Sequence, residues 1–243
     1  MKKIAVLTAL LFAALQIGYA QKVGLVLSGG GAKGAAHIGV IKALEENGIP
    51  IDYITGTSAG AIVGSLYAMG YTPEEMVELM LSEEFSYWQT GTVENEYKYY
   101  FKRPDPTPEF GHFSIDMTDS LQVKASFLPQ SLINPIQMNQ AFMALFSQAT
   151  AKAGWNFDNL FVPFRCVASD IYSKKAIIFK NGDLGDAVRA SMTFPFFFQP
   201  IWKDSIPLFD GGIYDNFPVG PMKEAFHPDV LIIGALVTAT LAC

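Results

Sequence analysis

The residues with the clearest chemical potential lie in one short motif, in which two glycines flank a serine. Gly56-Thr57-Ser58-Ala59-Gly60 follows the apolar, β-branched run 51–55 and precedes the small-residue run 59–69, which favours a helix. A serine in a tight turn from strand to helix is strained and exposed, and only small neighbours let the two elements approach closely. Ser58 is therefore a candidate nucleophile, although an ordinary turn explains this motif alone equally well.

A second glycine cluster follows another apolar run. Residues 23–27 predict a buried strand, and Ser28-Gly29-Gly30-Gly31-Ala32-Lys33-Gly34 leads from it into a helical pattern that ends near Asn47. A glycine loop between a strand and a helix presents backbone N–H groups to an anion. The amides of Gly29, Gly30, Gly31 and Ala32 are therefore candidate donors to an oxyanion. Lys33 is better explained as a solvated side chain at the helix start.

The spacing Gly29-x-Gly31-x-x-Gly34 also fits the fingerprint of a dinucleotide-binding loop. That fingerprint requires an acidic residue at the end of the second strand, about 20 residues further on. Asp52 lies near this distance but begins its strand, which ends at the serine motif instead. The chain has no Gly-Lys-Ser/Thr triplet, so a phosphate loop of the ATP-binding type is excluded. An oxyanion fits the loop better than a phosphate does.

An aspartate followed by two glycines forms the third motif. Asp210-Gly211-Gly212 comes after the short apolar run 206–209 and before the run 213–218, Ile-Tyr-Asp-Asn-Phe-Pro. Glycines after an aspartate at a strand end let another element approach closely, but the tripeptide alone is typical of a turn. Its significance comes from the order of the three motifs along the chain.

Together the three motifs resemble the patatin-like phospholipase family, in which a serine–aspartate dyad cleaves acyl esters of lipids. The resemblance extends over residues 23–233 and includes Ala190-Ser191 and the run 195–200; Asp-Gly-Gly stands where many members have Asp-Gly-Ala. It implies that Ser58 is the nucleophile and Asp210 the base, without a histidine. Because an aspartate has a reference pKa of about 3.9, such a dyad requires a dry site and strong oxyanion stabilisation.

Two other functions stay open at the level of the sequence. The order Ser58, Asp210, His227 matches the Ser–Asp–His triad of α/β-hydrolases. His227, however, lies close after Asp210 in a predicted helix-to-strand turn, where a surface polar residue is expected. In a non-catalytic alternative, the glycine loop binds a lipid or a nucleotide, and Ser58 and Asp210 are dispensable.

The elements that must position these motifs alternate between strand and helix. Strands are predicted at 23–27, 53–55, 164–168, 176–179, 208–209 and 230–233, and helices at 32–47, 59–69, 73–81, 136–149, 184–191 and 221–225. This alternation predicts an α/β domain with three α/β/α layers and a largely parallel central sheet, similar to patatin. Catalytic groups gather at the carboxyl ends of strands in such sheets, and all three motifs fall there.

Three features have both a functional and a structural interpretation. The aromatic, proline-broken segment 85–134 is either a lid or lipid-facing wall, or a peripheral cap with its own small core. The aromatic run 194–202 could line an acyl pocket, but buried core is the commoner fate of such a run. Cys166 lies in a strand-like run and is expected to be a small buried hydrophobe.

The first twenty residues have the pattern of a secretory signal peptide. Lys2 and Lys3 precede the apolar stretch 4–15, and Gly18-Tyr19-Ala20 is a small-x-small cleavage site. We expect residues 21–243 to form the mature domain, located in the periplasm, at the outer membrane or outside the cell. We also hold as a hypothesis that the chain is a fragment of a longer protein, because exported relatives often continue into further domains.

Charge and composition limit the partners. Removal of residues 1–20, which hold two lysines and no acid, changes the net charge from −6 to −8. An acidic exported protein is a poor candidate for nucleic acid, and its contact with a membrane or micelle surface must be apolar. The three histidines are scattered and no ligand spacing is apparent, so we expect no metal and no cofactor. The expected partner is a phospholipid or another acyl ester.

Overall fold

The computed structural model describes residues 21–92, 112–116, 122–126 and 132–236. The predicted signal peptide lies outside these residues. The strands are β1 (Val23–Leu27), β2 (Tyr53–Thr57), β3 (His112–Asp116), β4 (Gln122–Ser126), β5 (Phe164–Asp170), β6 (Lys175–Phe179), β7 (Ile201–Lys203), β8 (Ile206–Asp210) and β9 (Val230–Gly234). The α-helices are α2 (Ala36–Glu46), α3 (Ala59–Ala68), α4 (Pro73–Leu81), α5 (Glu83–Thr90), α6 (Ile136–Lys152), α7 (Leu184–Ser191) and α8 (Val219–Phe226). Short 3₁₀ helices are η1 (Gly31–Ala35), η3 (Phe157–Asn159) and η4 (Gly211–Ile213).

The central sheet has seven strands in the order β7-β8-β5-β2-β1-β9, and β6 also pairs with β5. The four strands β5, β2, β1 and β9 run parallel to one another, which confirms the predicted α/β fold with a mostly parallel sheet. All residues of β1 and β5 are buried, as expected for strands covered on both faces. The predicted strands are all present, whereas the short edge strand β7 was not predicted.

Asp210 reaches the carboxyl edge of the parallel strands by an unexpected route, because β8 runs antiparallel to β5. The register explains how. Thr57, the last residue of β2, pairs with Val167 of β5, and β5 continues to Asp170 beyond β2. β8 pairs with this overhanging part and runs back along it, so that Asp210 lies opposite Ala168. Asp210 therefore lies one residue pair along β5 beyond the end of β2, the strand that leads into Ser58.

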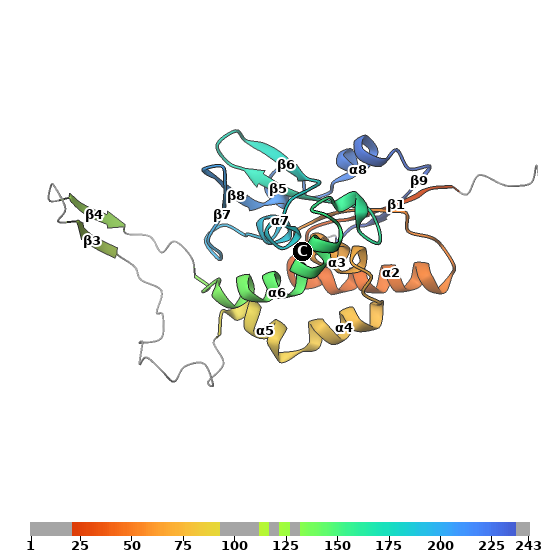
Figure 1. Cartoon of the computed structure of the whole chain (residues 1–243), viewed down its shortest axis with the longest axis horizontal. Helices are drawn as coiled ribbons and strands as arrows, with labels where there is room; N and C mark the ends of the chain where they lie inside the picture. The colour runs from red at the N-terminus through yellow and green to blue at the C-terminus, as the bar shows by residue number, and fades with distance from the viewer. Residues whose placement is uncertain (1–20, 93–111, 117–121, 127–131, 237–243) are drawn as a thin grey trace, which may run out of the picture.

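Helices cover both faces of the sheet, as the three-layer prediction requires. Figure 1 shows α8 on one face and α2, α3 and α7 on the other, with α4, α5 and α6 outside them. Met222 of α8 is fully buried and lies against Gly24 of β1, where a side chain on Gly24 would leave no room for it. On the opposite face, Gly64 of α3 lies against Ile54 and Phe164 in the same way.

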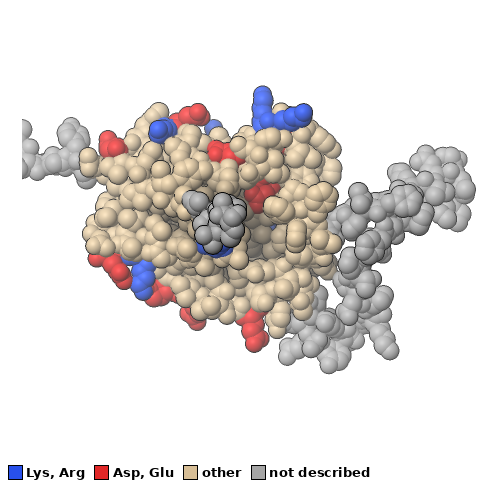
Figure 2. Space-filling model, turned by 180° about the vertical axis from the view of Figure 1, so that it is seen from behind, with Lys and Arg blue, Asp and Glu red and all other residues tan. Residues whose placement is uncertain are grey.

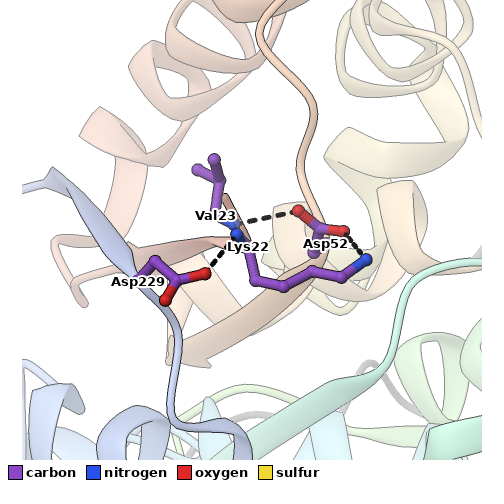
Figure 3. Close-up of polar contacts among 4 residues, drawn as sticks. All are labelled: Lys22, Val23, Asp52 and Asp229. Carbon is purple, nitrogen blue, oxygen red and sulfur yellow. Dashed lines mark hydrogen bonds and ion pairs between the residues drawn. The ribbon is translucent and has the colours of Figure 1, made fainter. Parts of the chain in front are cut away.

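Polar contacts fasten the amino ends of three neighbouring strands. Figure 3 shows Asp52, just before β2, between Lys22 and Val23: its carboxylate accepts from Lys22 Nζ at 2.6 Å and from Val23 N at 2.9 Å. The backbone N–H of Lys22 donates to Asp229, just before β9, at 2.8 Å. Asp52 therefore has a structural role at the edge opposite the glycine loop, which does not fit a ribose-binding acid.

The segment 85–134 is described only in part. Its first residues belong to α5, which the sequence did not predict, and β3 and β4 form an antiparallel two-stranded sheet of their own. Trp88 packs edge-on against Phe142 of α6, with ring centroids 6.4 Å apart. Residues 93–111, 117–121 and 127–131, which include the prolines of the predicted lid, lie outside the described residues. None of the described helices is long and apolar enough to cross a membrane.

Candidate active site

Ser58 lies at a strained turn between β2 and α3. Its backbone angles are φ 53° and ψ −119°, outside the conformations that a serine adopts without strain. Both flanking glycines are required by close backbone approach. A Cβ on Gly56 would lie 2.6 Å from the carbonyl carbon of Gly60, and a Cβ on Gly60 would lie 2.7 Å from that of Leu27. The serine elbow, defined here as residues 56–60, therefore depends on these two glycines.

The Ser58 hydroxyl donates a hydrogen bond to Asp210 Oδ2 at 2.6 Å. The other carboxylate oxygen, Oδ1, accepts the Gly212 N–H at 2.7 Å, and the Asp210 N–H donates to the Thr193 carbonyl oxygen at 2.8 Å. The carboxylate is thus fixed at both oxygens and at its backbone. Gly211 allows this approach because a Cβ there would lie 2.8 Å from the carbonyl carbon of Val167.

The surroundings of Asp210 strengthen it as a base. Its side chain is buried, and this burial raises the pKa of the Asp210 carboxyl, while hydrogen bonds from Ser58 and Gly212 act in the opposite direction. A carboxylate whose pKa is raised by desolvation accepts a proton more readily than one in water. The burial of Asp210 therefore supplies the desolvated carboxylate that a serine–aspartate pair needs.

Ser191 makes a contact that the sequence did not reveal. Its hydroxyl accepts the backbone N–H of Ser58 at 3.0 Å and donates to the Val167 carbonyl oxygen at 2.6 Å. This fully buried hydroxyl thereby bridges the elbow and β5. The motif Ala190-Ser191 belonged to the family resemblance, but only the structure shows what the hydroxyl touches.

The glycine loop, residues 28–34, is fixed at its first two residues. The N–H of Ser28 donates to the Gly234 carbonyl oxygen at 3.0 Å, its hydroxyl accepts the Leu236 N–H at 2.9 Å, and its carbonyl oxygen accepts from His37 Nε2 at 2.8 Å. The Gly29 N–H donates to the carbonyl oxygen of Asn216 at 3.2 Å, so this amide is already engaged.

The next three residues of the loop present their amides differently. Gly30 is the N-cap of η1, and Gly31 and Ala32 are its first residues, so their N–H groups precede the first acceptors within that helix. All three residues are exposed. Gly31 has φ +58°, which favours glycine, and Gly30 lies against Leu236, whose Cβ would be 2.8 Å from an added methyl group. The loop is therefore suited to bind an anion with backbone amides.

His37 is a second residue whose role only the structure reveals. It is buried, and this burial lowers the pKa of its imidazole, so the ring is neutral near pH 7. A carbonyl oxygen can only accept, so Nε2 must carry the proton donated to Ser28. His37 thus holds the glycine loop rather than the serine.

His227 does not join the dyad. It ends α8 in the left-handed conformation, with φ 47°, and is exposed. It lies just before Val230, which pairs with Val23 at the amino end of β1, whereas Ser58 follows the carboxyl end of β2. The triad alternative is therefore wrong for this fold. Lys33 is exposed on η1, as expected for a solvated lysine.

The aromatic run beside Asp210 is divided between surface and core. Phe198 is buried, as favoured for this run, and stacks below the guanidinium of Arg189. Phe194, Phe196 and Phe197 are instead exposed by 56%, 71% and 46%, so most of the run meets solvent. Cys166 is fully buried in β5, which confirms its prediction as a small hydrophobe.

In the part of the chain that the structure describes, no three His, Cys, Asp or Glu side chains gather as a metal site would require. The fold and the site together have the arrangement of a serine hydrolase: a nucleophile elbow, a buried carboxylate and a loop of free amides. A family model described as "Patatin-like phospholipase" matches residues 25–223. The chain therefore belongs to the patatin-like phospholipase family, which confirms the resemblance found in the sequence.

Relatives agree with this assignment. The patatin-like phospholipase domain-containing protein ZK370.4 of Caenorhabditis elegans is 30% identical over 204 residues, 83% of this chain and 13% of that protein. Lysophospholipase NTE1 of Pyricularia oryzae is 32% identical over 205 residues, 84% of this chain and 11% of that protein. The chain thus spans only a small part of the length of these curated relatives.

A solved structure shares the fold. VipD from Legionella pneumophila matches with a TM-score of 0.53 and 16% sequence identity, covering 88% of this chain and 49% of that chain. Identity this low shows a common fold alone.

Proposed function

We propose that this chain is a lipid acyl hydrolase in which Ser58 is the nucleophile and Asp210 the general base. The observation that carries the proposal is the 2.6 Å hydrogen bond from Ser58 Oγ to a buried carboxylate oxygen. Family membership supports an acyl ester of a lipid as the substrate. The relative named Lysophospholipase NTE1 supports the same class of substrate.

In the first step, Ser58 Oγ forms a bond to the ester carbonyl carbon while its proton passes to Asp210. The π electrons of the carbonyl move onto its oxygen, which becomes an oxyanion. The ester C–O bond then breaks, and the leaving alcohol takes the proton from Asp210. This leaves an acyl group on Ser58 and an ionised Asp210. Water hydrolyses the acyl-enzyme in the second step and releases a fatty acid.

The oxyanion is stabilised by the glycine loop. Of the four predicted donors, Gly29 already donates its N–H to Asn216, so the proposal assigns the role to Gly30, Gly31 and Ala32. One such donor is worth about 2.7–4 kcal/mol in the transition state. These amides offset the weakness of an aspartate as a base.

The proposed partner is a membrane or micelle surface, reached after export through the signal peptide to the periplasm, the outer membrane or the outside of the cell. The exposed rings of Phe194 and Phe196 follow Thr193, whose carbonyl oxygen accepts the Asp210 N–H, so apolar surface adjoins the residue that fixes the base. Figure 2 shows a face whose described surface is mostly uncharged, with Lys, Arg, Asp and Glu in small separate patches. Apolar contact with lipid does not depend on charge.

A panel of phospholipids, lysophospholipids and p-nitrophenyl esters tests the activity. We expect hydrolysis by the wild-type chain, resistance to EDTA, and a higher rate once the ester passes its solubility limit. Ser58→Ala should reduce the rate to background, while Ser86→Ala, a surface serine on α5, should leave it unchanged. A fluorophosphonate probe should label the wild type and not Ser58→Ala. Hydrolysis retained by Ser58→Ala, or loss of activity in EDTA, would contradict the mechanism.

A further inference from the structure

Asn216 contacts the site through its backbone and faces it with its side chain. Its carbonyl oxygen accepts the Gly29 N–H, and this contact does not depend on the side chain. The side chain belongs to an exposed residue and has no hydrogen-bond partner in the described part of the chain. A polar group beside the nucleophile that is not used within the protein is available for the reaction.

The side-chain oxygen of Asn216 lies beside the dyad, packed against two glycines. A methyl group built on Gly212 would lie 2.9 Å from Asn216 Oδ1 and 3.0 Å from Asp210 Oδ1. A methyl group built on Gly29 would contact Asn216 Oδ1 and lie 3.1 Å from Ser58 Cβ. Because these two glycines have no side chain, the Asn216 amide oxygen can lie close to both the nucleophile and the base.

Two acceptor oxygens this close to the nucleophile favour a water molecule. Both Asn216 Oδ1 and the ionised carboxylate of Asp210 are acceptors, so they cannot bond to each other. A molecule that satisfies both must donate two hydrogens, which a water can do and an ester or an ether oxygen cannot. Gly212 and Asn216 are both exposed, so water has access.

We propose that Asn216 is a catalytic residue that holds the water which hydrolyses the acyl-enzyme. Its Oδ1 accepts one water O–H, and Asp210 accepts the other. The inference rests on the proposed function, since it requires an acyl group on Ser58. It concerns only the second half of the reaction, because no water takes part in the attack of Ser58 on the ester.

The step balances with the groups present. The water oxygen forms a bond to the acyl carbon, and one water proton passes to Asp210. The carbonyl π electrons move onto the carbonyl oxygen, which becomes the oxyanion. The bond from the acyl carbon to Ser58 Oγ then breaks, and Asp210 returns the proton to Oγ. The fatty acid leaves, and the dyad is restored. Asn216 orients the water and exchanges no proton.

The test separates the two half-reactions in the full chain. Acylation is measured as the rate of fluorophosphonate labelling, and deacylation as the decay of the acyl-enzyme by intact mass after a pulse of p-nitrophenyl ester. For Asn216→Ala we expect labelling within about twofold of wild type and decay slower by about tenfold or more. kcat and KM should then fall together, with a burst of p-nitrophenolate. Asn181→Ala, an exposed asparagine away from the dyad, is the matched control.

Each alternative outcome overturns the inference. Unchanged decay of the acyl-enzyme would show that Asn216 does not hold the water. A parallel loss of labelling and decay would show a general effect on the dyad. If Asn216→Ala does not fold, Asn216→Leu keeps the shape without an acceptor and decides by the same measurements. Failure of the wild type to form any acyl-enzyme would instead refute the proposed function, and the inference with it.

Discussion

The serine elbow and the glycine loop meet at Ser58, yet the protein holds them in opposite ways. The elbow is held from within the core: Ser191 binds its backbone, Asp210 binds its side chain, and Gly56 and Gly60 pack against neighbouring backbone. The glycine loop is held from its first residues only, by contacts that come from the carboxyl-terminal part of the chain and from His37. Gly30, Gly31 and Ala32, which follow these residues, are exposed.

The difference follows from what each part must do. The proton passes between two protein groups, so their separation must be fixed before the substrate arrives. The oxyanion belongs to the substrate, so its donors must stay accessible and unpaired until charge develops. We therefore expect substitutions of the elbow glycines Gly56 and Gly60 to damage both fold and activity, and a substitution of the loop residue Gly31, which has open space around it, to act on activity alone.

The largest effect is expected at the base. Asp210→Asn leaves no group to accept the Ser58 proton, so kcat should fall by about 10²–10⁴-fold. The hydroxyl stays in place because it can accept from the new amide as well as donate. The measurement is kcat on a p-nitrophenyl ester, with circular dichroism as a check of folding. If most activity survives, the base is another residue.

Ser191→Ala should have the next largest effect, because it breaks the support of the elbow. The half-buried Ser58 N–H and the buried Val167 carbonyl lose their shared partner, which costs about 1–3 kcal/mol of stability for an unsatisfied group. kcat should fall as well, since Ser58 no longer keeps its strained geometry.

A second serine gives the matched control for Ser191. Ser169 is also fully buried, but within the described residues its hydroxyl has no hydrogen-bond partner. Ser169→Ala should therefore leave stability and kcat nearly unchanged. Urea unfolding and steady-state kinetics measure both variants, and equal losses would mean that the Ser191 bridge adds nothing beyond burial.

The sequence could predict the ends of the elements that form the site, because local signals mark them. Glycines on both sides of Ser58 and the run of apolar residues before it are visible in a single window of the chain. The direction of β8 was not visible, since a short apolar run has no polarity of its own. It follows from pairing with the part of β5 that extends beyond β2.

The contacts of Ser191, Asn216 and His37 were also out of reach of the sequence. Ser191 is 133 positions from the residue that it supports, and nothing in the local pattern specifies that pairing. His37 lies only nine positions after its partner Ser28. The contact depends on the path of the glycine loop between them, which the sequence does not specify. The features of the site that the sequence predicts are local motifs. The residues that hold these motifs in place come from other elements of the fold.

In the glycine loop, a comparison of two glycines tests backbone geometry alone. An added Cβ meets no atom within 4 Å at Gly31 or at Gly39, but only Gly31 has a left-handed φ, of +58°. Gly31→Ala should therefore shift the oxyanion donors and lower kcat more than it changes KM. Gly39→Ala, in the middle of α2, should instead raise stability by about 0.5–1 kcal/mol and leave kcat unchanged. A loss in KM alone for Gly31→Ala would indicate that the loop binds the ground state.

The smallest effect should appear in stability and come again from Asp210. Burial raises the pKa of its carboxyl in the folded state, so the folded protein binds a proton more tightly there than the unfolded chain does. Ionised Asp210 therefore lowers stability near neutral pH, and this cost disappears as the pH falls through the raised pKa towards the ordinary value of about 3.9.

Asp210→Asn removes the charge and should melt at a slightly higher temperature than wild type at pH 8. The advantage should shrink as the pH is lowered towards about 4, because wild-type Asp210 takes up a proton in the folded state at a higher pH than in the unfolded chain. Thermal melts of both proteins across this range measure the difference. Asp186→Asn, at an exposed aspartate whose pKa is also raised by desolvation and by Asp183, shows whether the trend belongs to carboxylates in general. A gap in melting temperature that stays constant from pH 8 to about pH 4 would mean that Ser58 and Gly212 fully compensate the ionised carboxylate, so that its burial costs no stability.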